Sequence, residues 1–453
     1  MRLETGVLVG VSETKSSVSA SQAVVSRLLQ MRQLWDDAAA AYFYPERFQV
    51  ALQNCITTSR TVTFILQSNK HKIDCFDEWY APHQERWRSN PIMTWVRDAR
   101  NSIEKRGDLN TLSQVRAMIV SGYLDGPETP WMSQVLFASP DHILASVPKK
   151  FLIPHILENG TLLIERRWVD SELPKMEVLE ALAFVYSELA DMVVSLLEHI
   201  KVDVPSIVGD TRPDAMGALA MDRAIYLSMR DGSLRGFRHF RRLIDITPKD
   251  TNKLISRYGK IATWEHLKEA KTFRAVAEAC YQNARAVMLR DGYHQSFIFL
   301  MKGLVVIRVI SVDHPDRASR YVLMRELARL ARIEGADGVM MISEVWTAHG
   351  KDVPKSGFAA DAINRGEALM LSAANSQGRS FMFCSTIERR RIASKKVKSL
   401  GEIVFEEDHF QFFWYPFMKE WGCVDEEKIR KSFSYMNKMG IELPKIVEGQ
   451  NCQ

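Results

Sequence analysis

The densest group of side chains with chemical potential lies at residues 100–109. Arg100 and Asn101 are followed by Lys105, and Gly107 is a typical stop for the helix predicted before it. Arginine, asparagine and lysine all donate hydrogen bonds, so together they suit an anion or a phosphodiester. The i, i+1, i+5 spacing places these three side chains within an arc of about 140° around a helix. The sequence therefore predicts an anion-binding or RNA-binding site at one helix end.

Arg60 is a further cation expected at that site. It lies in a predicted helix over 46–69, among threonines and serines that interrupt an apolar stripe. Because a polar break in a bundle helix usually meets polar partners, we expect Arg60 to face Arg100. The alternative is structural: Arg100 pairs with an acidic residue of a neighbouring helix, and Asn101 bonds a helix end or a buried carbonyl.

Basic residues alternate with phenylalanines in the segment 235–242. Arg238 and Arg241 would supply cations for phosphates, and the neighbouring rings would stack on bases. The alternative is an amphipathic segment whose rings enter the core while the arginines stay in water. A second basic run at 389–396 is followed by acidic residues, and a solvated surface is expected there.

Glu344 and His349 lie at the end of a predicted strand over 338–347. Many α/β folds place catalytic groups at strand ends. The two residues could act as a base and its partner, or as two ligands of one metal ion. Pairing of Glu344 with an arginine such as Arg365 is an equally good interpretation. No further histidine or aspartate has a recognisable metal-ligand spacing, so no metal site is predicted.

The composition is typical of a soluble globular protein. The chain has 453 residues, of which 46% are hydrophobic and 25% charged, and its net charge is +5. Such a small net charge does not favour a protein that coats nucleic acid. The N-terminus has no long apolar run, and the longest apolar stretches, at 181–200 and 297–312, contain charges that oppose membrane insertion. We therefore expect a cytoplasmic protein without a membrane partner.

Several chemical signatures are absent. The six cysteines include no Cys-x-x-Cys pair and are expected to be reduced, mostly buried thiols. The chain also lacks a phosphate-binding P-loop, a G-x-G-x-x-G fingerprint, the H-E-x-x-H of zinc proteases and the G-x-S-x-G of α/β-hydrolases. No cofactor is predicted.

The pattern of apolar residues predicts an α+β fold in three parts: an N-terminal helical bundle, a mixed region and a C-terminal α+β sandwich. Residues 20–130 form the bundle, 131–262 the mixed region with a linker near 201–213, and 263–453 the α+β domain. The main helices are expected at 21–44, 46–69, 73–89, 91–106, 174–200, 264–290 and 317–334. Strands are expected at 161–169, 297–312, 338–347, 368–374 and 379–387.

The helical region resembles the HEPN class of small helical bundles, many of which are RNases. The hallmark of that class is an arginine followed four to six residues later by histidine, often with a polar residue directly after the arginine. Arg100 and Asn101 match the first half, whereas residues 105–107 are Lys-Arg-Gly and provide no histidine. The resemblance covers roughly the first quarter of the chain. It implies a HEPN-like bundle without the family's cleavage chemistry.

Two functions follow from these observations. The first is an intracellular interaction or sensing protein with a non-catalytic HEPN-like domain. The second is an RNA-acting enzyme, a ribonuclease, that uses Arg100, Asn101 and Lys105. The predicted ligand is RNA or another phosphate-bearing molecule. The sequence leaves open a homodimer through the helical domain, which would place two copies of this cluster across one groove.

Overall fold

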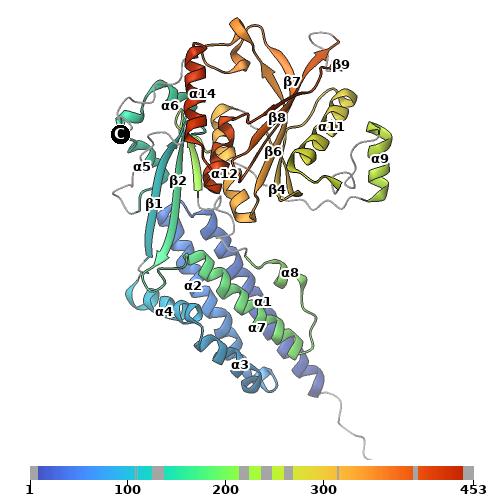
Figure 1. The fold of residues 1–453 in the computed structure, drawn as a ribbon. Helices are drawn as coiled ribbons and strands as arrows, with labels where there is room; N and C mark the ends of the chain where they lie inside the picture. Colours follow the sequence, from blue (N-terminus) through green and yellow to red (C-terminus); the bar gives the residue numbers. More distant parts are fainter. Residues whose placement is uncertain are drawn as a thin grey trace, which may run out of the picture. The chain divides into compact units, whose positions relative to one another are not determined.

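A computed structural model describes residues 9–107, 109, 111–124, 137–213, 224–235, 247–259, 269–313, 316–390 and 396–441. The chain forms two compact units (Figure 1). Unit 1 comprises residues 1–118, 129–148 and 162–227, and unit 2 comprises residues 119–128, 149–161 and 228–453. Helices dominate the N-terminal part and antiparallel strands the C-terminal part, which confirms the predicted α+β class. The boundaries expected at residues 131 and 263 stay predictions.

Unit 1 is built around a helical bundle in which α1 packs on α2 and α7, and α4 packs on α2, α3 and α7 (Figure 1). The α4 helix begins after Asn90, whose side chain accepts hydrogen bonds from two backbone N–H groups of the first turn. It ends at Gly107, where φ is 88°. The helices of the bundle are α1 (Val9–Ala40), α2 (Pro45–Ser68), α3 (Phe76–Arg88), α4 (Pro91–Arg106) and α7 (Val178–His199).

A three-stranded sheet accompanies the bundle, in the order β1-β2-β3. Its strands are β1 (Thr111–Val120), β2 (Thr161–Asp170) and β3 (Ala224–Ser228). The β2 strand confirms the prediction for 161–169. The bundle expected over 20–130 is not helical throughout, because residues 111–120 form β1, which alternates buried and exposed side chains with the period of two that a strand requires.

Two further segments differ from their predicted structure: the helix expected at 174–200 and the linker expected near 201–213. The helix expected from residue 174 begins at Val178, after Glu177, whose carboxylate accepts hydrogen bonds from the amides of Leu179 and Glu180. The segment expected as a linker contains the short helix α8 (Ser206–Asp210). The remaining short helices are η1 (Lys70–Lys72), α5 (Pro140–Ala145), η2 (Lys149–Phe151) and α6 (Pro154–Asn159).

Unit 2 is organised around a seven-stranded sheet whose neighbouring strands are all antiparallel. The main order is β10-β8-β7-β6-β4-β5, and β9 pairs with β8. The strands are β4 (Phe297–Lys302), β5 (Val305–Ser311), β6 (Gly338–Thr347), β7 (Gly366–Asn375), β8 (Ser380–Arg389), β9 (Val397–Leu400) and β10 (Val404–Glu407). The predictions for 338–347, 368–374 and 379–387 are confirmed.

The single strand expected at 297–312 is wrong, because that stretch forms a hairpin of β4 and β5. The turn contains Gly303, whose φ of 60° lies in the left-handed region that glycine adopts without strain. Apolar runs precede Lys302 and follow Gly303, and this Lys-Gly pair was the only local sign of the turn in the sequence. The hairpin leaves β5 at one edge of the sheet.

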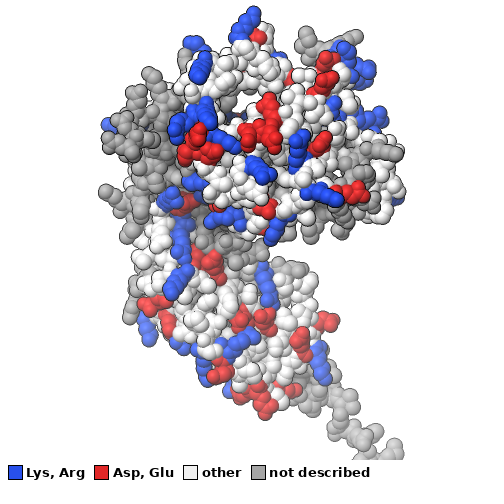
Figure 2. All heavy atoms as spheres, in the orientation of Figure 1, with Lys and Arg blue, Asp and Glu red and all other residues white. Residues whose placement is uncertain are grey.

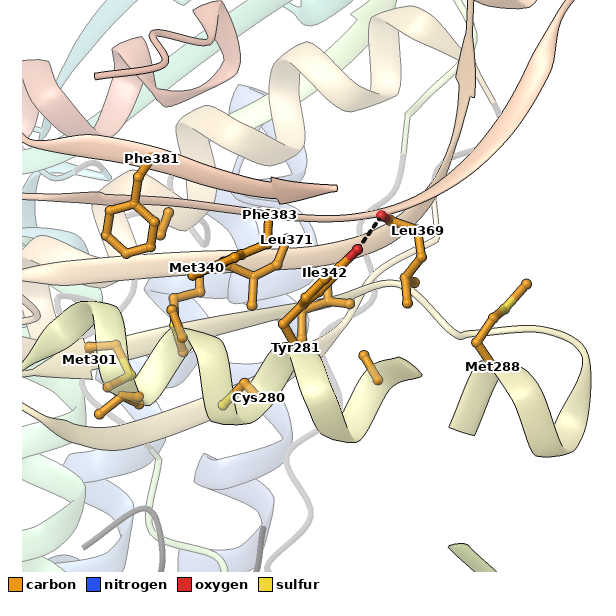
Figure 3. Packing of buried hydrophobic residues seen from close by; sticks show 14 of the residues in the cluster. Cys280, Tyr281, Met288, Met301, Met340, Ile342, Leu369, Leu371, Phe381 and Phe383 are labelled. Atoms are coloured by element: carbon orange, nitrogen blue, oxygen red, sulfur yellow. Dashed lines mark hydrogen bonds between the residues drawn. The ribbon is translucent and has the colours of Figure 1, made fainter. Parts of the chain in front are cut away.

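The α11 helix (Phe273–Asp291) covers one face of this sheet, and Figure 3 shows the packing. The Tyr281 hydroxyl donates a hydrogen bond of 2.9 Å to the carbonyl oxygen of Leu369 in β7. Phe381 and Phe383 of β8 join the same core. The helix predicted from residue 264 is described from residue 269 onward, and α11 begins after Thr272, which caps it.

The opposite face of the sheet carries α12 with η6 and α13, so unit 2 has three layers (Figure 1). The Trp414 indole donates a hydrogen bond of 2.8 Å to the Ser372 hydroxyl on that face. The α12 helix matches its predicted bounds, since Asp316 caps its start and Gly335 ends it. Further helices described in unit 2, besides η2 and α6, are α9 (Pro248–Tyr258), α12 (Arg317–Glu334), η4 (Gly350–Asp352), η5 (Ala359–Asp361), η6 (Phe412–Trp414), α13 (Tyr415–Trp421) and α14 (Glu426–Lys438).

Candidate functional site

Arg100 lies near the C-terminal end of α4, and its charge is compensated within its own helix. One terminal nitrogen lies 2.5 Å from a carboxylate oxygen of Glu104, one turn further along. The other donates a hydrogen bond of 3.2 Å to the side-chain oxygen of Asn101. About a third of the Arg100 side chain, 32%, is exposed. The partner is therefore an acid of the same helix, where the sequence interpretation allowed one from a neighbouring helix.

Arg60 and Lys105 are both exposed. Arg60 donates a hydrogen bond of 3.2 Å to the Thr63 hydroxyl in its own helix, α2. The α2 and α4 helices pack against each other, yet within the described ranges no hydrogen bond or ion pair joins Arg60 to Arg100. A shared anion site formed by the two arginines therefore stays a prediction.

Arg238 and Arg241 lie outside the described residues. Arg235, the first residue of the same basic segment, is described. One of its terminal nitrogens lies 2.6 Å from a carboxylate oxygen of Asp316 at the start of α12. This arginine therefore fixes a helix N-terminus of its own unit.

Glu344 lies in β6 with both of its carboxylate oxygens engaged. Oε1 accepts a hydrogen bond of 2.6 Å from the backbone N–H of His294. Oε2 lies 3.1 Å from a terminal nitrogen of Arg389 in β8. A base that abstracts a proton needs an accessible oxygen, and here both oxygens already accept hydrogen bonds.

Arg389 is the centre of this polar group, which we call the Arg389 clasp: Arg389, Glu344 and Glu367. Its Nε lies 2.6 Å from a carboxylate oxygen of Glu367 in β7, and its Nη1 donates a hydrogen bond of 2.9 Å to the Gly292 carbonyl. The sequence interpretation placed the run 389–396 on a solvated surface, but the Arg389 side chain is mostly buried. The strand predicted at 379–387 stopped two residues before Arg389, whereas β8 extends to Arg389 and thereby brings this arginine into the sheet.

His349 lies apart from the Arg389 clasp. It is exposed and precedes the short helix η4. Arg365, the partner considered for Glu344, instead lies over the Trp346 ring at 4.1 Å from the ring centre. Among the described residues, no group of three histidine, cysteine, aspartate or glutamate side chains could hold a metal ion.

The buried cysteines are poor nucleophiles in this structure. Burial raises the pKa of the Cys55 thiol, and it raises the pKa of Cys280 to about 11. Only the thiolate is strongly nucleophilic, so both residues stay protonated near neutral pH. They act as small apolar side chains in their cores.

Arg166 of β2 is a buried arginine in unit 1, with 2% of its surface exposed. It donates a hydrogen bond of 2.7 Å to the Ser113 hydroxyl and another to the Ala138 carbonyl, and its guanidinium lies over the Trp168 ring. Within the described residues no carboxylate forms an ion pair with it. Burial lowers the pKa of Arg166 to about 10.

The surface of the described residues carries both signs of charge. Figure 2 shows lysine and arginine interspersed with aspartate and glutamate over the face in view. Such mixing produces no broad field of one sign on that face. An anion site on that face must therefore depend on a local group of cations. Of the described helices, none has the length and apolar character to cross a bilayer.

Comparisons with known proteins identify one family. The family model described as "Bacteriophage lambda protein ea47" matches residues 15–434. Protein ea47 of Escherichia phage lambda is 30% identical over 331 residues, which represent 71% of this chain and 78% of that protein. No solved structure matches the chain.

Proposed function

The chain belongs to the bacteriophage lambda protein ea47 family, and from that premise we propose that it is a non-catalytic interaction protein. The family match covers most of both units, so the proposal concerns the whole protein. We assign the interaction to the open edge of β5 and its partner to a second copy of the chain. A cytoplasmic location and a HEPN-like character of the helical bundle belong to the same proposal.

The observation that carries the proposal is the apolar edge strand. β5 pairs with β4 on one side, and among the described residues no strand pairs with its other side. Val305, Ile307 and Val309 expose 65%, 38% and 50% of their surfaces. Protein sheets usually protect an edge with lysine or proline, and β5 contains neither. An unprotected edge of this kind favours the addition of another strand.

A second copy fits this edge by symmetry. If β5 pairs antiparallel with its copy about a two-fold axis at Arg308, Ile307 of each strand lies opposite Val309 of the other. Arg308 is the one charged residue of β5, and its guanidinium forms an ion pair with Glu334 of α12. The edge therefore carries no uncompensated charge to repel its copy.

The polar groups support a non-catalytic role. Arg100 is bonded to Glu104 and Asn101, and Glu344 is bonded to Arg389 and to a backbone amide. Proton transfer by Glu344 would first break its bond to Arg389 or its bond to the His294 backbone N–H. The first bond joins β6 to β8 and the second holds the segment before β4, so both have a structural role.

Sedimentation velocity of the full chain tests the proposal. We expect a concentration-dependent dimer for the wild type and a monomer for Ile307→Lys, because the lysine places a charge on the edge. The matched control is Ile333→Lys, since Ile333 is an exposed isoleucine of α12 in the same unit. A wild type that stays monomeric contradicts the proposal. A dimer that persists in Ile307→Lys also contradicts the proposal. It would favour a homodimer through the helical bundle, which the sequence analysis left as a possibility.

A ribonuclease or RNA-binding role at Arg100 is the second candidate. It is favoured by the Arg100 Nε atom, which is buried and has no hydrogen-bond partner among the described residues. Lys105 is exposed nearby in sequence and could contact a phosphate, but a lysine ammonium donates hydrogen bonds and has no lone pair with which to accept a proton. We therefore expect binding without cleavage if this site takes RNA.

Incubation of the purified protein with labelled RNA separates the two candidates. We expect no cleavage. Cleavage that disappears in Arg100→Ala and survives Glu344→Ala would make the ribonuclease the correct function. If RNA binds to the predicted site, Arg60→Ala and Arg100→Ala should weaken it non-additively.

A further inference from the structure

A shallow basic hollow lies between α9 and the end of α11. It has a volume of about 800 Å³ and is lined by six side chains: Lys249, Asn252, Lys253, Ser256, Arg257 and Arg290. Four of the six are cations, and the other two are neutral hydrogen-bonding groups. We propose that this hollow binds the phosphate backbone of a nucleic acid duplex without reading its sequence.

The cations form a stripe along α9. Lys249, Lys253 and Arg257 follow at intervals of four residues, so they project from one side of the helix on successive turns. The stripe is about 12 Å long at 1.5 Å per residue. One strand of a duplex presents a phosphate about every 3.4 Å along its axis, so the stripe spans three or four phosphates.

The hollow is held in place by contacts on one side. Arg257 lies 2.7 Å from an Asp291 carboxylate oxygen, and the Tyr258 hydroxyl donates a hydrogen bond of 2.8 Å to the other oxygen. The hydrogen bond from Arg257 holds the pKa of Asp291 below its usual value. Because Asp291 ends α11, these bonds fix the C-terminal end of α9 beside Arg290.

The remaining cations are available to a ligand. Lys249, Lys253 and Arg290 are exposed, and among the described residues none of them forms an ion pair. Asp250 is the nearest acid in sequence, but its carboxylate is engaged with Thr247 in a capping box. The four cations of the lining outnumber the two neighbouring carboxylates, Asp250 and Asp291, so the hollow keeps a net positive charge that favours a polyanion.

The shape and lining favour a duplex backbone over other anions. The hollow is open, which suits a polymer better than an enclosed mononucleotide. Among the described residues, no aromatic side chain lines the hollow, and the neighbouring Tyr258 is bonded through its hydroxyl to Asp291. The described lining therefore offers no platform for stacked single-stranded bases. Leu254 and Ile255 are the exposed apolar residues of α9, a small surface for insertion into a membrane.

Fluorescence anisotropy of the full chain with a labelled DNA duplex of about 20 base pairs tests the inference. Lys249→Ala/Lys253→Ala should weaken binding about tenfold in low salt and flatten the slope of log K against log salt by about 1.8. The matched control is Lys398→Ala/Lys431→Ala, which removes two exposed lysines of the same unit and the same net charge. The control should bind like the wild type.

Four results would overturn the inference. The first is absence of duplex binding by the wild type, and the second is equal loss in the control. The third is tighter binding of a single strand, or of phosphatidylserine vesicles, than of the duplex. The fourth is duplex binding that is lost in Arg100→Ala but kept in Lys249→Ala/Lys253→Ala. The β5 dimer is measured with a different variant, so failure of either proposal leaves the other testable.

Discussion

Arg166 and Arg389 show two different ways of burying a guanidinium in one chain. Arg166 in unit 1 is surrounded by a hydroxyl, a backbone carbonyl and an indole ring. Arg389 in unit 2 is held by two carboxylates and a carbonyl. Neutral partners satisfy hydrogen bonds without depending on the arginine's charge, whereas carboxylates need it. The comparison teaches that removing a buried arginine can have different energetic consequences, depending on whether its partners are neutral or charged.

The largest effect is expected at Arg389. Arg389→Met leaves Glu344 and Glu367 partly buried without their cation and should cost about 3 kcal/mol of stability. Hydrogen–deuterium exchange of peptides from β6 and β7 would report it. Arg390 is the exposed neighbour, so Arg390→Met is the control and should cost less than about 0.5 kcal/mol. Equal costs for the two variants would contradict the clasp.

A second prediction tests whether that loss of stability comes from the two carboxylates that have lost their cation. Adding Glu344→Gln and Glu367→Gln to Arg389→Met should restore about 1–2 kcal/mol, because neutral amides tolerate burial better than unpaired charges. The same exchange measurement applies to the triple variant. A triple variant less stable than Arg389→Met alone would show that packing, rather than charge, makes the arginine necessary.

A smaller effect is expected at Arg166. Arg166→Met removes a buried charge and leaves no carboxylate without its ion-pair partner, so the free energy of unfolding should change by about 1 kcal/mol or less. Exchange of peptides from β1 and β2 measures it. A loss as large as that of Arg389→Met would erase the contrast between the two arginines and indicate a counter-charge for Arg166.

The smallest effect concerns two histidines, one in each unit. Burial lowers the pKa of His294. Burial also lowers the pKa of His83, and the nearby Arg86 charge lowers it to a smaller extent. A lowered histidine pKa means that protonation favours the unfolded chain, so stability falls as pH drops below about 6.5 toward the lowered value. NMR titration should give both values below 6.5. A higher value for His294 would show that the Glu344 carboxylate acts on the ring as well as on the backbone.

The sequence predicted those elements whose signals are local. The α12 helix has its cap at Asp316 and its stop at Gly335, so its bounds were readable. The turn at Gly303 was missed because only Lys302 and Gly303 interrupt a long apolar run. The β1 strand was missed because the helical pattern of the preceding region was extended past Gly107.

The site was less predictable than the fold. Glu344 was recognised as an ionisable residue in an apolar strand, but its partner lies 45 residues away. Arg389 of β8 reaches Glu344 of β6 across the single strand β7 that lies between them in the sheet. That strand order cannot be read from the local sequence. The stripe of Lys249, Lys253 and Arg257 had a readable period of four, yet its meaning depends on Arg290 from another helix.

The interleaving of the two units has a consequence for synthesis of the protein. The chain passes between the units after residues 118, 128, 148, 161 and 227, so neither unit is one continuous segment. At about 5–20 residues per second, a ribosome needs roughly 10–45 s to make all the residues of unit 1. During that time the helices of unit 1 are synthesised without β3, and the segments of unit 2 that are already synthesised lack the seven-stranded sheet that follows later in the chain. A truncation at any one of these points leaves at least one unit incomplete, so single-domain fragments are poor substitutes for the full chain.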